Sequence, residues 1–206
     1  MQRTPLLTSS LIEHAGCNHA TTEIVSRSTD GALERSTWGE VARRSRRVAN
    51  MLARLGVYAG ERIVTLAWNR TAHLELYFGV TGSGVVLNTV NPRLFTGQIR
   101  FIVDHAESRY VFVDPELLPI VEAIAQDLPR IKAYIVLARR ALIPTSKLGN
   151  LLCYEELLAA EDDAYEWPRL DENAASTLWG GCRMMSYSLP NCRIRRRESF
   201  SKRNCE

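Results

Sequence analysis

The sequence lacks any long uninterrupted apolar segment. Its 206 residues are 46% hydrophobic and 24% charged, a composition typical of globular proteins that bury a core of one or two domains. No apolar run approaches the roughly 18 residues that a membrane-spanning helix needs. Residues 1–5 (MQRTP) also lack the apolar stretch of a signal peptide. We therefore expect a cytoplasmic protein without a membrane span.

Paired cysteines are missing as well. The five cysteines, Cys17, Cys153, Cys182, Cys192 and Cys205, show neither C-x-x-C spacing nor an accompanying pair of histidines. Zinc sites and disulfide frameworks both depend on such patterns. Free thiols are the expected state, and no metal-binding residue is assigned.

Net charge is small over most of the chain. Residues 179–206 hold seven Lys or Arg and two Glu, a net charge of +5, whereas residues 1–178 hold 19 basic and 21 acidic residues, a net charge of −2. A mildly acidic body has no electrostatic reason to bind nucleic acid. Only the basic tail, with the cluster RIRRR at 193–197, could do so, and it has few aromatic residues for stacking on bases.

Residues 37–55 predict an amphipathic helix. Apolar residues recur at helical spacing from Trp38 to Leu55, which places Trp38 in the core, and five arginines take the other face. Thr37 and Glu40 have capping-box spacing, and Gly56 stands where a helix ends in a left-handed residue. The arginine face could bind phosphate, but we favour a solvated helix surface.

The rest of the body alternates between strand and helix patterns. Four β-rich runs are separated by helical spacing, at 62–67, 85–90, 109–113 and 133–137. Further helices are predicted at 71–79, 98–106, after Pro115 and at 154–160, with a loop at 139–152. Such alternation predicts right-handed crossovers, and therefore an α/β fold with a mainly parallel sheet covered by helices on both faces.

Several short motifs occur in a recognisable order. They include STWGE at 36–40, GERIV at 60–64, GSGVV at 82–86 with NPRL at 91–94, HAE at 105–107, FVD at 112–114, YEEL at 154–157 and YEWP at 165–168. Taken together, residues 6–178 resemble an incomplete N-terminal domain of the adenylate-forming superfamily. The chain is most similar to fatty acyl-CoA synthetases, in particular the medium-chain fatty acid and methylthiopropionate CoA ligases.

The resemblance implies a chemistry for the full-length family. Such enzymes join ATP to a carboxylic acid, release pyrophosphate and pass the acyl group to CoA, so that ATP, magnesium, CoA and a fatty acid are implied. They hold the polyphosphate with a Ser/Thr/Gly-rich loop ending in Pro-Lys-Gly. In the family this loop, the magnesium ligand, the ribose-binding carboxylate and the catalytic lysine all follow the position of Leu178.

The family pattern stops at Leu178. The next residues, 179–185, read WGGCRMM. Their two glycines, Gly180 and Gly181, make too short a loop to wrap a polyphosphate. We divide the chain into a partial synthetase domain at 1–178 and a basic tail at 179–206, expected to be unstructured and unrelated to the family. A shifted reading frame or a splice would explain the change, and a genuine basic module is the alternative.

These observations leave three functions open. The first is a truncated acyl-CoA synthetase that is inactive alone and binds no cofactor itself. The second is a fragment that forms homo-oligomers or dimerises with an intact synthetase, and the least favoured is nucleic-acid binding by the tail. His73 and His105 are read as packed or surface histidines, and residues 91–93 as a turn. No catalytic or cofactor-binding residue is assigned.

Overall fold

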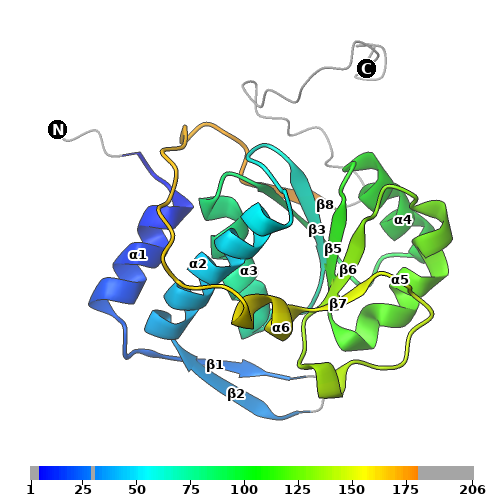
Figure 1. Cartoon of the computed structure of the whole chain (residues 1–206), viewed down its shortest axis with the longest axis horizontal. Coiled ribbons are helices and arrows are strands. Elements are labelled where there is room, and N and C mark those ends of the chain that lie inside the picture. The colour runs from blue at the N-terminus through cyan, green and yellow to red at the C-terminus, as the bar shows by residue number, and fades with distance from the viewer. Residues whose placement is uncertain (1–4, 29–30, 181–206) are drawn as a thin grey trace.

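The structure is a computed structural model that describes residues 5–28 and 31–180 (Figure 1). Its helices are α1 Thr8–Asn18, α2 Trp38–Arg54, α3 Thr71–Gly82, α4 Thr96–His105, α5 Leu118–Ile124 and α6 Tyr154–Ala159, with 3₁₀ turns η1 Pro115–Leu117, η2 Ala125–Asp127 and η3 Arg140–Leu142. Its strands are β1 Glu23–Arg27, β2 Leu33–Thr37, β3 Arg62–Leu66, β4 Val86–Val90, β5 Tyr110–Val113, β6 Ala133–Val136, β7 Leu151–Cys153 and β8 Thr177–Gly180.

Six of the described strands form one parallel sheet in the order β7-β6-β5-β3-β4-β8. Helices α2, α3 and α6 cover one face, and α4 and α5 cover the other (Figure 1). Helix α3 leads from β3 to β4, and α4 leads back across β3 to β5, so crossovers of one hand place these helices on opposite faces. The predicted α/β fold with a helix-covered parallel sheet is confirmed.

Strand side chains alternate between two apolar cores. Ile63, Leu87 and Phe112 point to the core under α2 and α3. Val64 and Val111 point to the opposite core under α4 and α5. All five side chains are at most 2% exposed. The continuous apolar strand sequences therefore reflect a sheet buried on both faces.

Helix α2 begins and ends where its sequence signals indicate. The Thr37 hydroxyl accepts a hydrogen bond from the Glu40 backbone N–H at 3.2 Å, whereas the Glu40 carboxylate pairs with Arg43 instead of completing the capping box. Gly56 follows the helix with φ of +69°. A residue with a Cβ rarely adopts this conformation, so the glycine is required there.

Besides β8, three strands lie outside the predicted elements. β7 forms within the segment predicted as a loop at 139–152, and it pairs with β6. The antiparallel hairpin β1–β2 precedes α2. The other predicted elements match observed ones to within a few residues.

The last described strand passes the predicted domain boundary. β8 includes Trp179 and Gly180, whose backbones pair with Thr89 and Val90 of β4. Strand pairing thus continues two residues beyond Leu178. The predicted tail from residue 181 onward lies outside the described residues.

Candidate functional site

The carboxyl ends of the parallel strands mark the place where α/β proteins usually bind ligands. Strand order reverses between β3 and β5, and ligands of open α/β sheets bind at such switch points. Here the chain places Arg70 just after β3 and Asp114 just after β5. Both residues are charged, and both lie at the carboxyl ends of interior strands of the sheet.

Asp114 and Arg70 form a buried ion pair. Their side chains are 1% and 9% exposed. The Asp114 carboxylate accepts hydrogen bonds from the Arg70 guanidinium and, at 2.7 Å, from the Trp68 backbone N–H. Burial raises the pKa of Asp114, although both hydrogen bonds oppose that shift. The two opposite charges therefore neutralise each other at the carboxyl ends of β3 and β5.

Arg70 also contacts the hairpin. Its guanidinium donates a hydrogen bond to the Ser28 hydroxyl at 3.2 Å and lies 4.0 Å from the Glu34 carboxylate. The hydroxyls of Ser26 and Thr71 are 3.0 Å apart nearby. The cluster therefore ties the β1–β2 hairpin to the loop that follows β3. Sequence analysis missed this role, because Arg70 lies four residues beyond the end of β3 and no local pattern marks its partner.

The two histidines occupy different environments. The His73 ring, on α3, lies with Nε2 3.2 Å from the Thr65 hydroxyl, and burial lowers its pKa. His105 stacks on Phe101 at the surface of α4, with ring centroids 5.5 Å apart. His73 is thus a packed residue of α3, and His105 is a surface residue of α4.

Asn91 shapes the turn after β4. Its side-chain carbonyl accepts a hydrogen bond from the Arg93 backbone N–H at 3.0 Å. Asn side chains that bond two residues ahead initiate turns of this kind. The predicted turn at 91–93 is confirmed.

The arginine face of α2 corrects one expectation. Arg44 is not solvated, because its side chain is 18% exposed and pairs with Glu75 of α3 at 2.8 Å and Glu155 of α6 at 2.7 Å. The Tyr154 hydroxyl donates a hydrogen bond to Glu75 at 2.9 Å. Burial opposes the charge of Arg44, but the attraction of Glu75 raises its pKa. This network joins three helices on one face of the sheet. Two carboxylates neutralise the charge of Arg44, so it is not available to bind phosphate.

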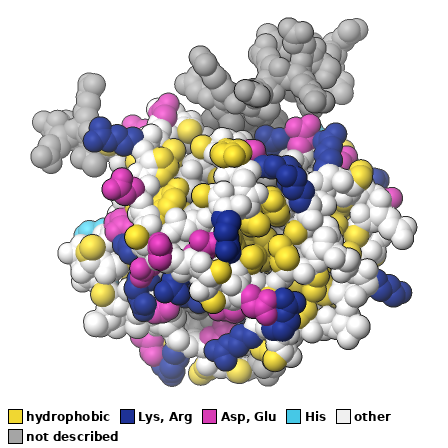
Figure 2. Space-filling model, in the orientation of Figure 1, with side chains coloured by type: hydrophobic (Ala, Val, Ile, Leu, Met, Phe, Trp, Pro, Cys, Tyr) yellow, Lys and Arg dark blue, Asp and Glu magenta, His cyan; other side chains and the backbone are white. Residues whose placement is uncertain are grey.

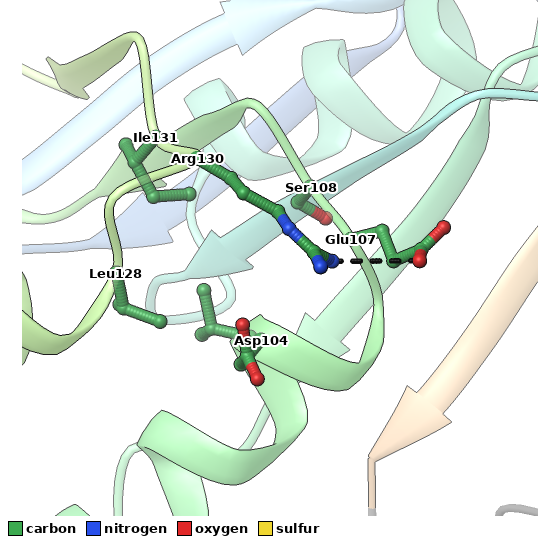
Figure 3. Close-up of a pocket in the computed structure, with 7 residues that line it drawn as sticks. Asp104, Glu107, Ser108, Leu128, Arg130 and Ile131 are labelled. Atoms are coloured by element: carbon green, nitrogen blue, oxygen red, sulfur yellow. Dashed lines mark hydrogen bonds and ion pairs between the residues drawn. The ribbon is translucent and has the colours of Figure 1, made fainter.

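A small depression lies at the opposite, amino-terminal end of the strands (Figure 3). Arg130 points across it toward Glu107, 3.4 Å away, and Asp104 and the 1%-exposed Ser108 also line it. Glu107 adopts a left-handed φ of 50°. The depression is too shallow to enclose a ligand. It lies beside the turn from α4 to β5, which is held by the ion pairs of Glu107 with Arg62 and Arg130.

A second, open groove lies between α1 and the start of α2, with a volume of about 390 Å³. Cys17, an exposed free thiol, lines it together with Arg43 and Arg46. Both arginines are already paired, with Glu40 and Glu13 respectively. The groove therefore offers no unpaired cation for an anionic ligand.

The described residues were searched for groups of side chains that could hold a metal ion. Within 5–28 and 31–180, no group of three or more His, Cys, Asp and Glu side chains is arranged to hold a metal ion. At the switch point, the one strongly buried cation is neutralised by Asp114. The helices of the described segment are also too short or too polar to cross a bilayer.

Curated proteins resemble this chain over most of its length. It is 42% identical over 178 residues to a medium-chain-fatty-acid–CoA ligase of Ectopseudomonas oleovorans, covering 86% of this chain and 33% of the relative. It is 44% identical over 178 residues to a 3-methylmercaptopropionyl-CoA ligase of Ruegeria lacuscaerulensis, with the same coverage. The chain spans about a third of the length of the curated relatives it matches.

Solved structures share the fold. The anthranilate CoA ligase AuaEII in complex with anthranoyl-AMP superposes with a TM-score of 0.72 at 19% identity, over 84% of this chain and 31% of that one. Coronafacic acid ligase from Pectobacterium brasiliense gives 0.72 at 14% identity, over 84% and 33%. The family model described as AMP-binding enzyme matches residues 12–174. The chain therefore belongs to the AMP-binding enzyme family.

Proposed function

We propose that this chain is the first part of an AMP-forming ligase that activates a fatty acid with ATP and transfers it to CoA. The identity of 42–44% to two acyl-CoA ligases over 178 residues carries the proposal. The substrate is a medium-chain or similarly short carboxylic acid, because those two relatives are named for such acids. A cytoplasmic location fits the proposal.

We further propose that the chain does not catalyse this reaction alone. Its described part supplies a packed sheet, with one buried ion pair whose two charges neutralise each other at the switch point. Phosphoryl chemistry instead needs preorganised donors aimed at the polyphosphate. The family resemblance implies that those donors follow the position of Leu178, and on this proposal residues 5–28 and 31–180 act as the scaffold on which they are built.

An assay of AMP release tests the second proposal. The purified chain is incubated with ATP, magnesium, CoA and either octanoate or 3-methylmercaptopropionate. We expect AMP at the level of the enzyme-free control. Release that depends on both the acid and the chain would contradict the proposal.

A second candidate function is association with an intact synthetase or with a second copy of the chain. Several apolar side chains of the N-terminal elements are exposed, among them Leu6 at 77%, Leu11 at 52% and Leu33 at 60%. On this second proposal, these side chains make the contact with the other protein. Co-purification of the tagged chain with an intact ligase of this family would support the association, and a monomeric profile with no bound ligase would exclude it.

A further inference from the structure

The segment that connects α6 to β8 follows an unusual path. Residues 161–176, which we call the strap, contain no helix or strand. The strap runs from α6 past α2 and α1 before it returns to the sheet at β8 (Figure 1). Acidic and basic side chains intermingle on this side of the molecule (Figure 2). The strap thus links the edge strand β8 to the helices α1 and α2, which lie away from that edge of the sheet.

The first part of the strap is fastened to α2. Arg54 pairs with Glu161 at 2.6 Å. The Asn50 amide donates hydrogen bonds to the Asp162 backbone carbonyl at 3.1 Å and to the Ala164 carbonyl at 3.3 Å. These contacts fix the point at which the chain leaves α6.

The middle of the strap is fastened to α1 by Trp167. Its indole N–H donates to the Glu13 carboxylate at 2.6 Å. The same carboxylate receives two hydrogen bonds from Arg46 of α2, at 2.9 and 2.7 Å. Glu13 therefore joins α1, α2 and the strap at one point, and the hydrogen bond from Arg46 is the main reason that its pKa is lowered.

The Trp167 ring lies against a glycine of α3. A Cβ added to Gly82 would come within 2.6 Å of Trp167 Cζ3, so any side chain there would displace the ring. The ring also packs with the small core formed by Ile12, Val41 and Phe78. The indole is thus held by shape as well as by its hydrogen bond.

The end of the strap delivers β8 to the sheet. Leu170 lies against Gly84, where an added Cβ would come within 2.9 Å of it. The Glu172 carboxylate accepts a hydrogen bond from the Leu6 backbone N–H at 2.8 Å. The Leu87 backbone N–H of β4 then donates to the Ser176 carbonyl at 3.0 Å, immediately before β8 begins.

We propose that Trp167 is a latch through which helix α1 holds the edge strand β8 on the sheet. β8 has a strand partner on one side within the described residues, so it depends on β4 and on its own tether. Releasing Glu13 or displacing the indole frees the strap, and β8 then separates from β4 while the strands β3, β5 and β6 stay paired. This inference does not depend on the proposed ligase activity.

Amide hydrogen exchange on the full chain tests the latch. Glu13→Ala removes the acceptor of the Trp167 bond from α1, far from β8 in sequence. We expect the amides of Leu87 and β8 to exchange at least about tenfold faster, with the amides of β3 and β5 unchanged. Leu11→Ala, an exposed position on the same helix, is the matched control and should leave β8 protected.

Gly82→Ala provides an independent second variant. It displaces the indole without removing a hydrogen-bonding group, and it should accelerate the same amides. Gly97→Ala, where an added Cβ meets nothing within 4 Å, is its control. Unchanged protection of Leu87 and β8 in both test variants would overturn the latch, and so would equal acceleration of all amides, because that indicates global destabilisation.

Discussion

A single buried ion pair holds the carboxyl ends of β3 and β5 together. Asp114 sits at the switch point, where a related fold could place a ligand, yet its charge is satisfied by Arg70 and by the Trp68 N–H. A buried ion pair is costly to break, because removing one partner leaves the other charge without compensation. The loop after β3 is therefore joined to the end of β5 by a contact whose loss is costly.

Removing Arg70 should expose that cost. Arg70→Met is expected to lower the free energy of unfolding by about 3–5 kcal/mol. Adding Asp114→Asn should recover more than half of the loss, because the new amide needs no counter-ion and still accepts from Trp68. Urea unfolding of the two variants measures both effects.

The matched control is Arg100→Met. The Arg100–Asp127 pair spans 3.8 Å with both side chains about half exposed, so its loss should cost less than about 1 kcal/mol. A loss for Arg70→Met as small as this control would show that the pair at the switch point is not buried in solution.

His73 should make stability depend on pH. Burial lowers its pKa in the folded chain below the ordinary value of 6.5, so between these two pKa values the unfolded chain binds more protons. The free energy of unfolding is then full above about pH 6.5 and falls at lower pH, by at most about 1.4 kcal/mol per pH unit. His73→Gln should flatten this part of the curve, measured by urea unfolding between pH 7.5 and 5.5. Parallel curves for parent and variant would contradict the assignment.

Elements with strong local signals were predictable, and elements held by tertiary contacts were not. Helix α2 has a cap at Thr37 and a glycine at its end, so both boundaries are written in the sequence. β7 has three residues and exists because β6 offers it a partner. The same limit applies to the site, since nothing local in Arg70 reveals its partner 44 positions away.

The contact between α2 and α3 depends on a glycine. A Cβ at Gly79 would come within 2.5 Å of Val48 Cβ and 2.7 Å of the Ser45 carbonyl oxygen. Alanine is the better helix former by about 1 kcal/mol, but the clash involves backbone that cannot move aside. Close helix packing therefore outweighs helix propensity here.

Gly79→Ala should destabilise the chain by about 1–3 kcal/mol despite its better propensity. Gly97→Ala, in the open first turn of α4, should be neutral or stabilising by up to about 1 kcal/mol. Thermal unfolding of the two variants should shift the midpoint in opposite directions. A stabilised Gly79→Ala variant would mean that α2 and α3 lie farther apart than described.

For the whole molecule, the segment that matches the family model covers most of the described fold. The matched segment at 12–174 covers the hairpin, both helical layers and five of the six parallel strands described. β8 then ends the described chain at the edge where β4 is its neighbour. We interpret this part of the molecule as a scaffold, with the chemistry of the proposed ligase built on the strand ends that follow.

A chimera provides the most direct measurement of this proposed ligase identity. The 178 matched residues of the Ruegeria lacuscaerulensis 3-methylmercaptopropionyl-CoA ligase are replaced by their counterparts from this chain, and formation of 3-methylmercaptopropionyl-CoA is followed. The same ligase without the segment is the control and should give no product. We predict acyl-CoA formation that requires ATP, CoA and the acid. A soluble chimera that unfolds cooperatively but forms no acyl-CoA would contradict the proposal.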